Sequence, residues 1–173
     1  MKFMKAVFNK EPNPNHLHIG DILSVWDVAR NKLIGLSTLS IYYRQANDKE
    51  LKDLVEDGIK FVLSDHINKI QKLLKDKGYD FPSGSDWHRK LDENAPFVIP
   101  NTMIDDEGIA MSLREIIRLT LSIEAEGLRN TTDEDIRALL LDILEDDNRG
   151  YSAVLALQRK KDWKDFPPTI LAH

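Results

Sequence analysis

His66 is the residue of this sequence best suited to chemistry, because its ionisable imidazole interrupts an apolar helical stripe. It lies four residues after Val62 and three after Leu63, and Ile70 follows four residues later. Positions three or four apart share one helix face, so His66 is predicted on a buried face. A buried imidazole either binds a transition-metal ion or forms a hydrogen bond within the core.

Two carboxylates are predicted to lie at the height of His66 if the chain packs as four helices. Counted from the turn between the first two helices, Asp27 reaches the level of His66. Glu124 reaches it if the third helix runs parallel to the second, and the fourth helix passes it near Glu145. One hypothesis is therefore that His66 and Glu124 bind a single iron, manganese or zinc ion, with Asp27 as a further ligand or beside the ligands.

A dinuclear metal site is not expected from the same residues. Such sites take one Glu from each of two helices and a Glu-x-x-His pair from each of the other two. Here the residue three before His66 is Leu63, and the nearest match in the fourth helix is Glu145-x-x-Asn148, which ends in an amide. An amide binds transition metals poorly. We therefore favour a hydrogen-bonded core histidine and keep the mononuclear site as the alternative.

Proline-free stretches predict the helices that position these side chains. The seven prolines leave residues 15–81 and 101–166 free, and a proline inside a helix costs about 3 kcal/mol. Asn15 and Thr131–Thr132 are predicted N-caps, and Gly78 a left-handed C-terminal stop. The predicted helices span about 15–45, 48–77, 105–130 and 132–162. The apolar stripe expected on the first helix comprises Ile19, Ile22, Trp26, Ala29, Leu33 and Leu36.

The lengths of the connections predict how the helices are joined. Short turns join the first helix to the second and the third to the fourth, whereas residues 78–104 form a long crossover. Two antiparallel hairpins linked by a crossover are typical of ferritin-like bundles. The sequence therefore predicts an all-α, ferritin-like four-helix bundle, as a single domain over residues 1–173.

Each predicted helix has one glycine beyond its first two turns: Gly35, Gly58, Gly127 and Gly150. A glycine inside a helix costs about 1 kcal/mol relative to alanine, so the repetition calls for an explanation. Gly35 and Gly58 are predicted at one level of the bundle. There they would allow close helix approach or leave room for a ring such as that of Tyr151, and chance is the third explanation.

Composition argues against several other classes of protein. The chain has 173 residues, of which 42% are hydrophobic and 31% charged, enough for one domain with a substantial core. It has no cysteine, so disulfides and thiolate metal sites are impossible. The net charge of -5 argues against non-specific nucleic-acid binding. Without a signal-peptide pattern or an apolar run of about 20 residues, we expect a cytoplasmic protein that does not bind membranes.

Short motifs follow one another in order along nearly the whole chain. They are HIG at 18–20 followed by Trp26, His66, Gly78 leading to FPSG at 81–84, ENAPFV at 93–98, DIR at 135–137 and FPP at 166–168. In their order and spacing they resemble a family of ferritin-like, spore-coat-protein-like domains of unknown function from endospore-forming bacteria. The resemblance implies a helical bundle of the spore coat or of sporulating cells, without established catalysis, and it supplies no metal-ligand set.

Two functions from different classes follow. The favoured one is a non-catalytic structural or assembly bundle that associates with itself or with other coat proteins and binds no cofactor. The alternative is a metal-binding bundle with a redox or metal-handling role that uses His66, Glu124 and Asp27. The metal content of the protein distinguishes the two.

Overall fold

Helices account for all regular secondary structure in the computed structural model, which describes residues 17–82 and 104–163. The all-α prediction is confirmed, and no strand occurs in these two ranges. The second predicted helix is a continuous rod of three consecutive segments. The elements are α2 (Ile19–Gln45), the rod formed by α3 (Lys49–Asp57), the π-helix η1 (Gly58–Leu63) and α4 (Ser64–Asp76), then α5 (Asp106–Asn130) and α6 (Glu134–Lys160).

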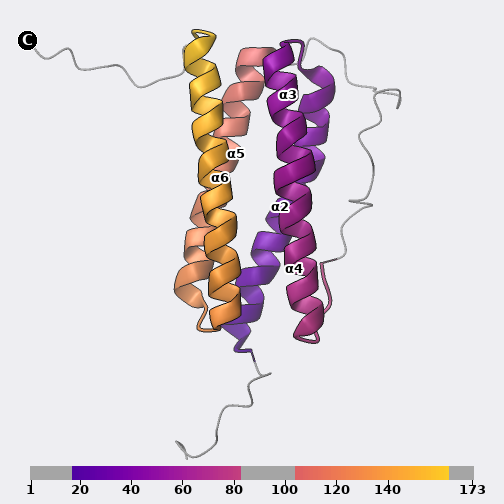
Figure 1. Cartoon of the computed structure of the whole chain (residues 1–173), viewed down its shortest axis with the longest axis vertical. Helices are drawn as coiled ribbons and strands as arrows, with labels where there is room; N and C mark the ends of the chain where they lie inside the picture. The colour runs from indigo at the N-terminus through magenta and orange to yellow at the C-terminus, as the bar shows by residue number, and fades with distance from the viewer. Residues whose placement is uncertain (1–16, 83–103, 164–173) are drawn as a thin grey trace, which may run out of the picture.

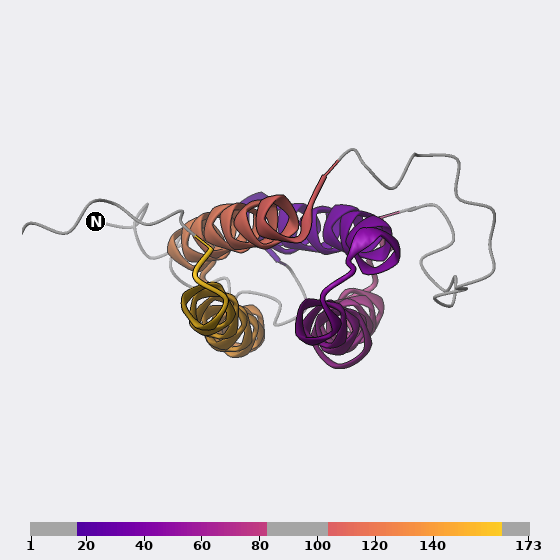
Figure 2. The ribbon, with the colours of Figure 1, turned by 90° about the horizontal axis from the view of Figure 1, so that it is seen from above.

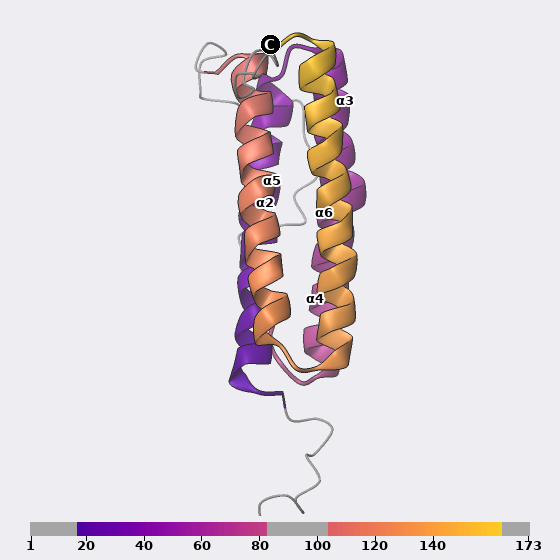
Figure 3. The same ribbon diagram turned by 90° about the vertical axis from the view of Figure 1, so that its left-hand side faces the viewer.

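The four rods form two antiparallel hairpins, as Figure 1 shows. Seen from the end, α2 and α5 lie on one side of the bundle and the α3–α4 rod and α6 on the other (Figure 2), and the side view agrees (Figure 3). The start of α5 lies beside the α2–α3 turn, because Asp106 Oδ1 accepts a hydrogen bond of 2.8 Å from Asn47 N. Consequently α5 runs parallel to the α3–α4 rod, which confirms the predicted crossover wiring.

Acidic side chains cap three of the helices. Asp48, Asp105 and Asp133 each accept a hydrogen bond from a backbone N–H three residues later, at 2.8 to 3.0 Å. Each thereby satisfies an amide that has no partner within its helix. Gly78, with φ of 83°, follows the end of α4 as predicted. The predicted cap Asn15 lies outside the described residues, and α2 begins at Ile19 rather than near residue 15.

Asp21 fixes the start of α2 and joins it to the α5–α6 turn. Its Oδ2 accepts from His18 N at 2.8 Å, and its Oδ1 accepts from Thr131 Oγ1 at 2.6 Å and from Thr132 N at 2.7 Å. Burial raises the pKa of Asp21, but these hydrogen bonds outweigh it and the net pKa is lowered. Since Thr131 and Thr132 are engaged with Asp21, the cap of α6 is Asp133 and not the predicted pair.

The π-helix η1 is a feature that the sequence analysis missed. The backbone N–H and the hydroxyl of Ser64 both donate to Ile59 O, five residues earlier. Buried side chains recur at every fourth position through this stretch. They are Leu51, Val55, Ile59, Leu63 and Ile67. In an α-helix each such step would turn the side chain by about 40° from the buried face, and the wider π turn compensates for that drift.

The core consists of two apolar clusters with a polar layer between them. One cluster lies toward the α2–α3 turn and includes Leu36, Leu51 and Leu113, and the other lies toward the α5–α6 turn and includes Val28, Ile70 and Leu140. None of the helices in the described ranges is long and apolar enough to cross a membrane.

Candidate functional site

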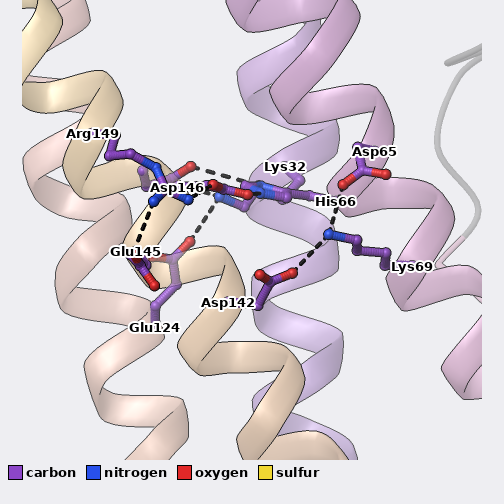
Figure 4. A network of polar contacts seen from close by, with 10 residues as sticks. Lys32, Asp65, His66, Lys69, Glu124, Asp142, Glu145, Asp146 and Arg149 are labelled. Carbon is purple, nitrogen blue, oxygen red and sulfur yellow. Dashed lines mark hydrogen bonds and ion pairs between the residues drawn. The ribbon is translucent and has the colours of Figure 1, made fainter.

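Lys32 lies at the centre of the polar layer, where side chains from all four rods meet (Figure 4). Its side chain is 1% exposed. Its Nζ lies 2.5 Å from Asp147 Oδ2 on α6 and 2.7 Å from Glu124 Oε1 on α5. A single ammonium group therefore joins three rods, and the layer depends on its charge.

Glu124 is fully buried, and its pKa is strongly shifted. Among the described residues neither of its oxygens has a hydrogen bond of good geometry, so its contact with Lys32 is an ion pair by distance alone. Burial raises the pKa of Glu124 to about 8, with Lys32 opposing the shift and Asp147 adding to it. Asp147 has the shorter contact and a side chain 9% exposed. The ammonium therefore has its closest partner in Asp147, and burial favours the protonated form of Glu124.

His66 lies beside this trio and is also fully buried. Its Nε2 lies 3.2 Å from Asp146 Oδ2, and its Nδ1 lies 3.7 Å from Asp147 Oδ1 without a hydrogen-bond partner among the described residues. Burial and the charge of Lys32 lower the pKa of His66 and outweigh the two aspartates. The imidazole is therefore neutral, and because Asp146 accepts, Nε2 carries the proton.

Asp146 links the buried layer to the surface. Arg149 donates to its Oδ1, and this hydrogen bond lowers the pKa of Asp146. Arg149 Nη1 also donates to Glu145 Oε1 at 2.8 Å, on the exposed side of α6. The layer thus ends in a solvent-exposed network that holds the carboxylate facing His66.

The structure brings two of the three predicted site residues together. His66 and Glu124 both reach the polar layer, and the prediction of a hydrogen-bonded core histidine is confirmed. Asp27 is exposed and lines a separate surface pocket with Ser24 and Glu126, so it is not part of the layer. The fourth-helix acids at this height are Asp146 and Asp147, within the stretch predicted near Glu145.

Lys32 was missed because the predicted stripe of α2 was only partly right: Ala29, Leu33 and Leu36 are buried as predicted, but the buried face also includes Lys32. Ile19, which began the predicted stripe, is 77% exposed. The buried stripe includes Val25, Val28, Lys32, Leu36 and Leu39, spaced by three or four residues. A lysine at such spacing within an apolar stripe is the same signal that singled out His66.

The donor set around Lys32 does not fit a metal ion. In residues 17–82 and 104–163, no three His, Asp or Glu side chains are grouped so that they could hold one. Asp147 and Glu124 face the Lys32 ammonium at 2.5 and 2.7 Å, and this ammonium occupies the space between them. What the arrangement provides is a neutralised, hydrogen-bonded interior layer.

The fold and its interior layer define a ferritin-like helical bundle. The chain belongs to the family described as "Protein of unknown function (DUF3231)", whose sequence model matches residues 5–173. No curated protein matches the sequence.

Three crystal structures share this fold. A Bacillus halodurans protein provisionally named a spore coat protein has a TM-score of 0.80 at 19% identity, over 92% of this chain and 100% of its own. A two-domain Anabaena variabilis protein with DJ-1/ThiJ/PfpI-like and ferritin-like domains has a TM-score of 0.65 at 16% identity. The match covers 88% of this chain and 40% of that one. A conserved hypothetical protein of Mycobacterium tuberculosis has a TM-score of 0.63 at 11% identity, over 80% of this chain and 96% of its own.

Proposed function

We propose that this protein is a non-catalytic, self-associating structural module of the spore-coat kind. The observation that carries the proposal is the ammonium of Lys32 between Glu124 and Asp147. An ammonium supplies the positive charge that a metal ion would supply to these carboxylates, but it has no open coordination position and no redox chemistry. The polar layer then serves to hold the four rods in one register, as buried polar groups do in other helical assemblies.

The similarity to the Bacillus halodurans protein supports the coat assignment, since the two chains share nearly their full length. At 19% identity this likeness concerns the fold. The assembly role therefore rests on features of the present chain, which are its interior layer and its surface.

The metal content of the protein tests the interior layer. Protein purified without chelators, and protein then incubated with Fe(II), Mn(II) or Zn(II) and desalted, should carry far less than one ion per chain. The reason is that a cation would have to displace the Lys32 ammonium from its two carboxylates. Elemental analysis checks this.

A His66→Ala/Glu124→Ala variant is the control for adventitious binding, since those two residues are the predicted ligands. One tightly held ion per wild-type chain that this variant loses would contradict the proposal and establish the metal-binding alternative.

The surface feature that favours self-association is an apolar stripe on α2. Ile19, Leu23, Ile34 and Ile41 are 77%, 53%, 58% and 39% exposed. With 3.6 residues per turn, their spacing places all four within an arc of about 60° on one side of the helix. An apolar stripe along an outer helix is typical of an interface, and a second copy of the same stripe would cover it in a two-fold dimer.

Sedimentation equilibrium tests this interface. Wild-type protein at micromolar concentration should sediment as a dimer or larger species, and Ile34→Glu should shift it to the monomer because the substitution buries a charge in the contact. Leu141→Glu is the matched control, since Leu141 is 53% exposed on α6, away from the stripe. A monomeric wild type, or equal effects of the two substitutions, would contradict it.

A further inference from the structure

A cavity of about 370 Å³ lies among the four rods, on the α2–α3 side of the polar layer. Its walls are mostly aliphatic and come from α2, α3, η1, α5 and α6, with Leu39, Leu113 and Val154 among them. The exposed residues that line it are Asp57 and Phe61 on one rod and Arg149 and Ala153 on α6. The cavity therefore opens to solvent between η1 and α6.

Of the four glycines that lie beyond the first two turns of their predicted helices, three face this cavity: Gly35, Gly58 and Gly150. A Cβ atom built on each would come no closer than 3.7, 3.5 and 3.9 Å to its nearest neighbour, which is ordinary van der Waals contact. At Gly127, by contrast, a Cβ would lie 3.2 Å from Leu140. Close helix packing thus does not require glycine at the first three positions, and Tyr151 does not line the space. What these glycines provide is open volume, at a cost of about 1 kcal/mol each relative to alanine.

The π-helix forms one side of the same cavity. Gly58, Phe61, Val62 and Leu63, all within η1, line it. Single π turns within helices occur often at functional sites, because they displace side chains from the regular α-helical spacing. Two costly local features, the glycines and the π turn, therefore coincide at one place.

The inner end of the cavity is polar but already neutralised. Lys32 and Asp147 line it and are paired with each other, and at the opening Arg149 is paired with Asp146. Asn31 Nδ2 donates to Thr120 Oγ1 at 2.8 Å in the same wall. A charged ligand would find no unpaired opposite charge at this end and would lose its hydration on entry. An uncharged hydrogen-bonding group fits these polar partners.

We propose that this cavity is a binding site for an uncharged, predominantly apolar small molecule with one hydrogen-bonding group. The apolar part would lie against the aliphatic walls and glycines, and the polar group would face the inner end near Lys32 and Thr120. Ligand sites commonly measure about 300–1,000 Å³, and a cavity of about 150 Å³ already holds benzene. The cavity thus suits a molecule of bicyclic size or a medium-length alkyl chain. The site does not depend on the assembly role.

N-phenyl-1-naphthylamine is a suitable probe for the full-length protein, because it is uncharged, consists of a bicyclic naphthyl group and a phenyl ring joined by one N–H, and fluoresces in apolar surroundings. Wild-type protein should bind it saturably, at one probe per chain. Gly150→Leu fills the cavity and should weaken binding by about tenfold or more. Ser152→Leu is the matched control: it places the same side chain on α6 at an exposed position that does not line the cavity, and should bind like wild type.

Circular dichroism of Gly150→Leu should show an intact bundle, since leucine forms helices better than glycine. Gly35→Ala adds only a methyl group to the cavity wall, so its affinity for the probe should lie between those of wild type and Gly150→Leu. The proposal is overturned if wild-type protein shows no saturable binding, or if Gly150→Leu and Gly35→Ala bind the probe as tightly as wild type. It is likewise overturned if Ser152→Leu weakens binding as much as Gly150→Leu.

Discussion

Replacing Lys32 with methionine should lower the free energy of unfolding by about 3–5 kcal/mol, the usual cost of removing one partner from a buried ion pair. Methionine matches the unbranched lysine stem and keeps the packing, so the loss reports the charge. Asp147 and Glu124 would both lose the Lys32 ammonium, which lies 2.5 Å from Asp147 and 2.7 Å from Glu124. Unfolding in guanidinium chloride measures the effect, which appears as a lower midpoint with an unchanged slope.

Lys69→Met is a matched control, because Lys69 also lies between two carboxylates. Its Nζ is 2.8 Å from Asp65 and 2.7 Å from Asp142, but its side chain is 39% exposed. Solvent-exposed pairs contribute about 0–1 kcal/mol, so this variant should be nearly as stable as wild type. Similar losses in Lys32→Met and Lys69→Met would show that burial of the layer is not what makes Lys32 important.

The free energy of unfolding of the wild type should fall as the pH rises from about 4.5 to about 8. Glu124→Gln should remove this fall. The pKa of Glu124 is raised by burial from 4.5 to about 8 in the folded protein. A carboxyl group whose pKa is higher in the folded than in the unfolded state stabilises the fold fully below its unfolded-state pKa. This contribution is lost as the pH rises through its folded-state pKa. The wild type should therefore lose up to about 1.4 kcal/mol per pH unit relative to Glu124→Gln across this window. Unfolding midpoints of both proteins at several pH values measure the difference.

His66 acts in the opposite direction but does not disturb this comparison. Its pKa is lowered by burial and by Lys32, so its contribution is present above pH 6.5 and is lost as the pH falls. Both proteins contain His66, and subtraction cancels its effect. Glu145→Gln is the matched control, because Glu145 is exposed on α6 beside Arg149 and should give the wild-type pH profile. A wild-type profile parallel to that of Glu124→Gln would contradict the raised pKa.

Much of the fold was predictable because the relevant signals are local. Proline is disfavoured inside helices, and Gly78 follows the end of α4. The predicted bounds of the four rods therefore lie within a few residues of the observed bounds. The long segment between the second and third helices decided the wiring. The burial of His66 followed from its position in an apolar stripe.

The site was less predictable because it depends on which helix face turns inward. Asp27 lies at the predicted height on α2, but its side chain is exposed. The side chain of Lys32, five residues later, is buried in the polar layer. Long apolar side chains such as Ile19 suggested a different stripe, although apolar residues are common on protein surfaces. The π turn did leave a signal, since four consecutive steps of four residues from Leu51 to Ile67 exceed the α-helical period.

The π turn makes the identity of the inward-facing residues of α4 depend on how η1 winds as well as on composition. If η1 wound as an ordinary α-helix with no residue removed, everything beyond it would rotate by about 100° about the rod axis. The imidazole of His66 would then leave Asp146, and the lower half of the rod would present different side chains to its neighbours. Deleting one residue within Gly58–Leu63 would instead let the rod become a regular α-helix and leave Ser64–Asp76 facing as it does now, so the π turn accommodates one additional residue without turning the inner surface outward.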